Sequence, residues 1–247
     1  EVKSCIIKPT EESHGDNVVV IKSIEYYDDD CLLNLYNGDR KLLSQLLTKN
    51  PLIIESLISQ TDQMANLNKS SVNTVRFMTT LYPNGSAKLV AACIKIGREG
   101  QCVDNAGRGG NVDAGGDVHI GKLYHTIRYD GIRKVVPIEK HPDSNATIEG
   151  LIIDDWTDIV KRVLEYQQAF PFVKAAGWDI AITNDGPVVV EVNDMWDRTG
   201  QLFLGRGWRN EIRDCYKAWK SCGVSYPIRF GGYPNELSPR RLCEIER

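Results

Sequence analysis

Three oxygen-bearing side chains, those of Asp179, Glu191 and Asn193, lie in a segment that predicts a β-hairpin. Apolar and polar residues alternate on both sides of Asn184-Asp185-Gly186, a sequence typical of a tight turn. With the turn centred near Asp185, Asp179 is expected opposite Glu191 on the adjacent strand. Two carboxylates about 5 Å apart repel each other unless a cation lies between them.

The residue types on this face indicate Mg²⁺ rather than zinc. Asp, Glu and an Asn amide supply hard oxygen ligands, which suit Mg²⁺ together with phosphate oxygens and water. The opposite face is expected to be buried, and it collects Trp178, Ile180, Ile182, Val188, Val190 and Val192. From the hairpin alone, a solvent-facing acidic hairpin without a metal is an equally good interpretation.

Cationic and amide groups upstream could hold phosphates. Lys8 ends a predicted strand just before a polar loop, residues 11–17, whose backbone amides could cover an anion. Arg76 shares a predicted strand face with Thr74, and further donors follow at Lys95, Asn105 and Arg108. Phosphoryl transfer needs such donors because charge spreads over the transferred oxygens. Taken singly, each of these residues is more often a surface charge.

The elements that must position these groups are mainly strands. Strands are predicted over residues 5–7, 18–21, 52–55, 74–80 and 88–96, and helices over 39–47, 157–168 and 210–220. The strand at 52–55 could be an ordinary buried strand or could line an adenine slot. The glycine-rich segment 97–121 is predicted to be irregular and too flexible for the core.

Composition limits the class of protein. The 247 residues carry a net charge of -3, so nothing in the overall balance recruits nucleic acid or an anionic membrane. No apolar run approaches the roughly 20 residues that span a bilayer, and we expect no membrane insertion. The seven cysteines form no CxxC pair, which favours reduced thiols and a cytoplasmic protein. Because the sequence opens on Glu1 and enters a strand at once, we expect the natural chain to extend upstream.

An ordered set of motifs resembles the ATP-grasp superfamily, and within it the sugar-transfer-associated group, whose members are relatives of α-L-glutamate ligases. The resemblance runs from about residue 4 to about residue 205. Its motifs are Lys8-Pro9, Ile54-Glu55, residues 71–76, Val103-Asp104-Asn105 with Gly109-Gly110, His141-Pro142-Asp143, residues 177–183 and Glu191-Val192-Asn193.

The resemblance implies an α+β ATP-grasp fold, in which two lobes with mainly antiparallel sheets clasp ATP between them. The smaller lobe would be residues 1–57, and the larger lobe residues 58–247. The implied activity is an ADP-forming carboxylate–amine ligase that works through an acylphosphate, in polysaccharide or secondary-metabolite biosynthesis. Its cofactors would be ATP and Mg²⁺, with two ions expected and Mn²⁺ as a substitute. Its partners would be a small-molecule carboxylate and an amine, and the oligomeric state is not predicted.

The resemblance also implies roles for single residues. Asp179, Glu191 and Asn193 match the metal ligands, and Lys8 matches the lysine that reaches the α- and β-phosphates. Glu55, with the backbone of Ser56 and Leu57, matches the adenine-binding linker. Lys95 is expected to be a further nucleotide-binding residue. Arg76 and Asn105 match positions at the transferred phosphate and the second metal, with Arg108 beside them.

Two alternatives to a ligase remain open at this point. One is a kinase on the same fold, and the other is a nucleotide-binding module without catalysis. Acceptor specificity is expected in the segment 111–143 and upstream of the chain. His141 could contact the acceptor, and a capping or surface histidine is an equally good interpretation.

Overall fold

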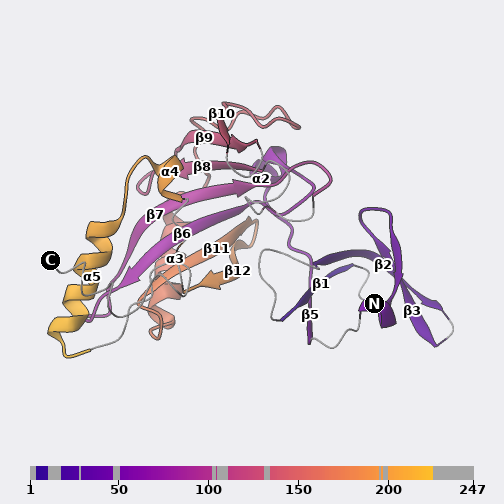
Figure 1. The fold of residues 1–247 in the computed structure, drawn as a ribbon, viewed down its shortest axis with the longest axis horizontal. Helices are drawn as coiled ribbons and strands as arrows, with labels where there is room; N and C mark the ends of the chain where they lie inside the picture. The colour runs from indigo at the N-terminus through magenta and orange to yellow at the C-terminus, as the bar shows by residue number, and fades with distance from the viewer. Residues whose placement is uncertain are drawn as a thin grey trace.

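The computed structural model describes residues 4–10, 18–27, 29–46, 51–101, 104, 111–130, 134–194, 196 and 200–224. Its strands form two sheets, one of five strands and one of seven, and every neighbouring pair is antiparallel (Figure 1). The predicted α+β class with mainly antiparallel sheets is therefore confirmed. The predicted division at residue 57 falls between the two sheets, and it stays a prediction as a domain boundary.

The small sheet has the order β4-β3-β2-β1-β5. It is built from β1 (Cys5–Pro9), β2 (Val19–Tyr27), β3 (Asp30–Leu35), β4 (Arg40–Leu42) and β5 (Leu52–Glu55), with the short helix α1 (Leu43–Leu46) after β4. One face buries Cys5, Ile7, Ile21, Leu33 and Leu35. Cys5 is buried in this cluster and acts as a small core side chain.

The large sheet has the order β10-β9-β8-β7-β6-β11-β12. Its strands are β6 (Thr74–Leu81), β7 (Ala87–Ile96), β8 (Val112–Gly116), β9 (Leu123–Tyr129), β10 (Val135–Pro137), β11 (Ala175–Thr183) and β12 (Gly186–Asn193). The hairpin turn needs Gly186, whose φ is +103°. In this order, β11 lies between its hairpin partner β12 and β6, which is distant from it in the sequence.

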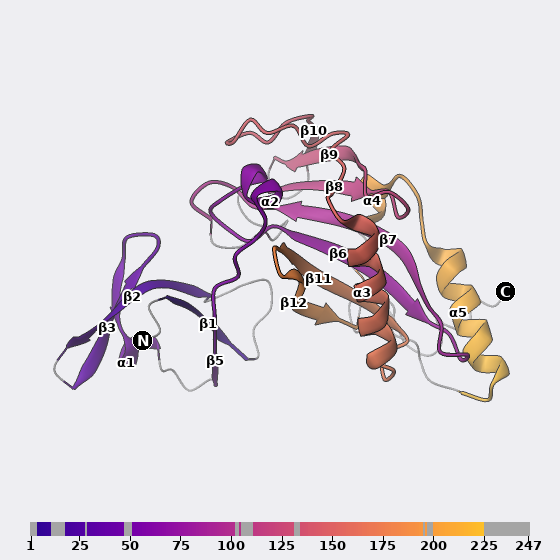
Figure 2. The same cartoon turned by 180° about the vertical axis from the view of Figure 1, so that it is seen from behind.

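Helices cover the large sheet on both faces. The helices α2 (Asp62–Leu67) and α3 (Trp156–Ala169) pack on one face with the larger apolar cluster, as Figure 2 shows for α3. The other face packs against α4 (Gly200–Leu204) and α5 (Arg209–Ser221) through Met78, Ala91, Cys93, Phe203 and Cys215. Among the described residues, no helix has the length and apolar content needed to cross a membrane.

Two predicted elements are wrong. Residues 39–47 were expected to form one helix, but they begin as the strand β4, and α1 is only four residues long. The expected irregular segment 97–121 contains β8, all five residues of which are buried. Small residues in this segment allow close packing: a Cβ on Gly115 would lie 2.8 Å from the ring of Tyr124. Gly115 therefore allows a core strand to pack closely, and it does not make the segment flexible.

The apolar face of the hairpin also differs from the prediction. Trp178, Ile180 and Ile182 are buried, but Val188, Val190 and Val192 on the sheet-edge strand β12 are between 36% and 39% exposed. A β-bulge shifts the register, so that Asp179 pairs with Glu191 but Ile180 pairs with Val189. The bulge reverses the alternation beyond that point, which a strict two-residue period cannot anticipate.

Candidate functional site

The predicted residues of the large sheet converge on the face opposite α3. Asp179 pairs with Glu191 on one side, which confirms the expected register, and with Arg76 of β6 on the other. Thr74, two residues from Arg76 and on the same face, pairs with Lys95 of β7. Strand alternation on three neighbouring strands thus brings these side chains to one surface.

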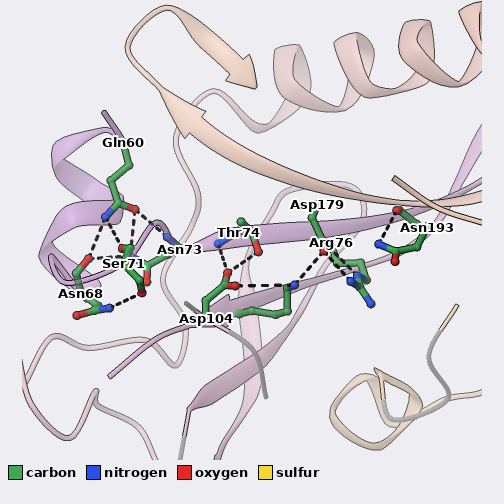
Figure 3. A network of polar contacts seen from close by, with 11 residues as sticks. Gln60, Asn68, Ser71, Asn73, Thr74, Arg76, Asp104, Asp179 and Asn193 are labelled. Carbon is green, nitrogen blue, oxygen red and sulfur yellow. Dashed lines mark hydrogen bonds and ion pairs between the residues drawn. The ribbon is translucent and has the colours of Figure 1, made fainter. Parts of the chain in front are cut away.

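Asp179 is the centre of this group. Both carboxylate oxygens of Asp179 accept from Arg76, with Nε to Oδ1 at 2.7 Å and Nη2 to Oδ2 at 2.6 Å (Figure 3). Lys95 Nζ donates to Oδ2 at 3.0 Å. Asp179 is only 2% exposed, so a buried carboxylate here holds two cations. Such charge-assisted, bidentate bonds orient the guanidinium as well as neutralise it.

The electrostatics of the group follow from burial and pairing. Burial alone would raise the pKa of Asp179, but Lys95 and Arg76 outweigh it, so the pKa lies below its usual value. Burial would lower the pKa of Lys95, but the charges of Asp104 and Asp179 raise it. Asp179 and Lys95 are therefore both charged at neutral pH.

Asp104 is a member of the group that the predicted site residues did not include. Its Oδ2 accepts from the backbone N–H of Thr74 at 2.9 Å and from the Thr74 hydroxyl, and its Oδ1 lies 4.0 Å from Lys95 Nζ. Burial raises its pKa, against the pull of Lys95 and Thr74. Its place beside Asn105 in the motif 103–105 was the available signal.

Glu191 and Asn193 complete the row on the edge strand. Glu191 is exposed and Asn193 is half-buried. With its amide oriented to satisfy both neighbours, Asn193 donates to Glu191 Oε1 at 3.1 Å and accepts from Arg76 Nη2 at 3.3 Å. Arg76 therefore contacts two of the three predicted metal ligands.

The nucleotide-binding residues predicted in the small sheet lie together on β1 and β5. Lys8 Nζ and Glu55 Oε2 form an ion pair of 2.6 Å, with side chains 27% and 45% exposed. Ser56 is exposed and Leu57 half-buried, directly after β5. The structure thus gathers these predicted residues on a different sheet from Arg76, Lys95 and Asp179.

Three other predictions have different outcomes. Asn105 and Arg108 lie outside the described residues. His141 is buried, its Nε2 lies 2.9 Å from the carbonyl of Gly97, and its Nδ1 faces the backbone N–H groups of Asp143 and Ser144. Burial lowers its pKa. These contacts favour the capping interpretation of His141, in a buried rather than a surface position.

The donor chemistry of the row is compatible with Mg²⁺. No group of three or more His, Cys, Asp or Glu side chains that could hold a metal occurs within the described ranges. Asp179 already accepts three hydrogen bonds, while the exposed carboxylate of Glu191 has Asn193 as its neighbour. Glu191 and Asn193 would therefore be the main protein ligands of an ion, with Asp179 directly opposite Glu191 in register. Few protein oxygens suit Mg²⁺, which keeps phosphate and water ligands.

The described part of the chain holds two antiparallel sheets, one with the ion pair of Lys8 and Glu55 and one with a row of cations and acids, and this arrangement is consistent with the α+β fold of the ATP-grasp class. The family described as sugar-transfer associated ATP-grasp matches residues 1–217. The chain belongs to this family. ATP-grasp proteins generally bind ATP and Mg²⁺, and the family supports an ATP-utilising, broadly ligase-like enzyme. A comparison with the curated proteins finds no match.

Proposed function

We propose that this protein is an ATP- and Mg²⁺-dependent carboxylate–amine ligase that forms an amide bond through an acylphosphate. The observation that carries the proposal is the group formed by Arg76, Lys95 and Asp179, in which one buried carboxylate orients two cations. Preorganised cations are what a phosphoryl group needs as it moves between oxygens.

In the proposed first step, a carboxylate oxygen of the acid attacks the γ-phosphorus of ATP, and the bond to the ADP oxygen breaks. Arg76 and Lys95 would stabilise the charge on the transferred oxygens, and Lys8 would bind the remaining phosphates. Mg²⁺, held by Glu191 and Asn193 with Asp179, would neutralise phosphate charge. In the second step an amine attacks the acyl carbon and inorganic phosphate leaves.

The sheets give each lobe its part in this proposal. The smaller lobe, residues 1–57, would hold the adenine and the α- and β-phosphates through Glu55, Ser56, Leu57 and Lys8. The larger lobe would hold the reacting groups. Asn105 and Arg108 would add donors near the transferred phosphate. The free, buried thiols of Cys5, Cys93 and Cys215 support a reducing, cytoplasmic location.

The test is an acylphosphate trap. Purified protein is incubated with ATP, Mg²⁺, hydroxylamine and, in separate reactions, acetate, succinate or L-glutamate, and both ADP and hydroxamate are measured. A ligase produces ADP and hydroxamate in equal amounts, and only when an acid is present. A stable phosphorylated acceptor would instead identify a kinase, and ATP binding without ADP would identify a non-catalytic module.

A further inference from the structure

Asp113 is a buried carboxylate to which the proposed chemistry gives no role. It lies on β8 opposite Lys95 of β7, and so on the sheet face that carries Arg76 and Asp179. Asp113 is 2% exposed, and within the described part of the chain its Oδ1 has no hydrogen-bond partner. A buried acceptor without a donor costs stability, and a ligand that donates to it would offset that cost.

The groups around Asp113 explain why Oδ1 has no hydrogen-bond partner among the described residues. The charged and titratable groups that act on it are Arg76 of β6, Lys95 and Cys93 of β7, Asp104 before β8 and Tyr129 of β9. Lys95 directs its ammonium to Asp179 at 3.0 Å and toward Asp104 at 4.0 Å. Lys95 thus forms ion pairs with the other two acids. Among the described residues, Asp113 has no ion pair.

The environment also suits a group that changes protonation near neutral pH. Burial raises the pKa of Asp113 to about 7, while Tyr129 and Lys95 act in the opposite direction. An acid whose pKa lies near the working pH can accept a proton in one step and release it in the next. The neighbouring acids Asp104 and Asp179 lack this freedom because Thr74, Arg76 and Lys95 bind their oxygens.

We propose that Asp113 binds the protonated nitrogen of the amine substrate through Oδ1 and takes a proton from it, which frees the nitrogen lone pair for attack. This inference rests on the proposed ligase function. The nitrogen lone pair bonds to the acyl carbon, and the bond from that carbon to the phosphate oxygen breaks with its electrons on phosphate. The proton taken by Asp113 then passes to water, and the second proton that nitrogen loses as the amide forms goes to the departing phosphate. Asp113 would therefore select an amine that carries an N–H, which can donate to the free oxygen.

Asp113→Asn separates amide formation from acylphosphate formation. The variant has nearly the same shape but cannot take a proton, and Asp130→Asn is the matched control, because Asp130 is exposed and pairs only with Lys134 in the described residues. Hydroxylamine is largely unprotonated at pH 7 and needs little help from a base, whereas methylamine is almost fully protonated. We expect Asp113→Asn to retain hydroxamate formation but to lose about 100-fold or more in amide formation with methylamine.

Equal losses with hydroxylamine and methylamine, or no loss with either, would overturn the role of Asp113. If the unaltered protein made no hydroxamate from acetate, succinate or L-glutamate, the acylphosphate proposal would fail for these acids. That result would leave the proposed amine site at Asp113 standing. A binding measurement then decides the amine site by itself.

That measurement follows the carboxyl carbon of Asp113 by ¹³C NMR in protein labelled at aspartate, with the signal assigned by its loss in Asp113→Asn. Methylammonium chloride is expected to shift the signal, and tetramethylammonium chloride, which has no N–H, is expected to leave it in place. A chemical shift that does not change with methylammonium, or that changes equally with both cations, would contradict the inference. Asp113→Ser supplies the assignment should the Asn variant fold poorly.

Discussion

The two sheets hold their charged residues in opposite ways. In the large sheet, Asp179 is 2% exposed and accepts three hydrogen bonds from Arg76 and Lys95. In the small sheet, Lys8 and Glu55 form one ion pair, and their side chains are 27% and 45% exposed. A multiply bonded buried group keeps its geometry, whereas a half-exposed pair exchanges partners at little cost. Under the proposed function, this difference would suit the large sheet to positioning the reacting groups and the small sheet to adaptable binding.

Glu191→Ala is expected to have the largest effect, abolishing ATP turnover with a loss of about 10³-fold or more. The reason is the loss of the exposed carboxylate that would share a metal with Asn193. Because Glu191 is exposed, the unfolding temperature is expected to change little. The control is Asp185→Ala in the turn of the same hairpin, which should keep full turnover. Normal ATP hydrolysis by Glu191→Ala would show that the metal assignment is wrong.

Asp179→Ala tests the rigid half of the comparison. The substitution leaves the guanidinium of Arg76 and the ammonium of Lys95 buried together without their shared carboxylate. We expect a loss of about 3–5 kcal/mol in the free energy of unfolding, measured by urea denaturation. Glu55→Ala in the small sheet is the contrasting variant and should cost no more than about 1 kcal/mol. Similar losses in both variants would remove the distinction between the sheets.

Asp113→Asn should stabilise the protein in a pH-dependent way. The pKa of Asp113 is raised from 3.8 to about 7, so the folded protein holds a proton that the unfolded chain releases. The burial penalty on the carboxylate is absent below about pH 4, grows as the pH rises, and is complete above about pH 7. The variant should therefore match the unaltered protein at pH 4 and gain a few kcal/mol at pH 8.

Thermal or urea denaturation at a series of pH values measures this gain. The control is Asp185→Asn in the exposed turn of the hairpin, whose stability difference from the unaltered protein should stay constant. A stability difference between Asp113→Asn and the unaltered protein that stayed constant from pH 4 to pH 8 would contradict the raised pKa.

Lys8→Ala tests the adaptable half and should have the smallest effect on the fold. Removing one partner of a half-exposed pair is expected to cost no more than about 1 kcal/mol of stability. The proposed contact with the phosphates predicts a Kd for a non-hydrolysable ATP analogue about tenfold higher, measured by calorimetry. Lys8→Arg keeps the charge and should restore part of the affinity. An unchanged Kd would remove Lys8 from the proposed nucleotide site.

Local pattern was sufficient for some parts of the site. The turn at Asn184-Asp185-Gly186 and the alternation around it predicted that Asp179 faces Glu191, and the register confirms it. Alternation on one strand also placed Arg76 on the same face as Thr74. Both predictions depend on a few neighbouring residues and a fixed two-residue period, which the sequence displays directly.

Other parts depended on contacts that no local pattern contains. The carboxylate of Asp179 binds Arg76, which is 103 residues away, and Lys95, which is 84 residues away. Only the order β7-β6-β11 in the sheet brings them together. The bulge in the hairpin and the burial of β8 were also missed, since both depend on how neighbouring strands pack.

The sequence by itself thus determined which residue types could hold ATP and a metal, through motifs in a recognisable order and the family to which they belong. The tertiary structure decided how those residues are used. Asp179 is neutralised by two buried cations, Glu191 stands exposed on an edge strand, and Asp113 retains an oxygen without a partner in the described residues. Burial and long-range pairing set the charge and freedom of each carboxylate, and these arise only when distant strands assemble.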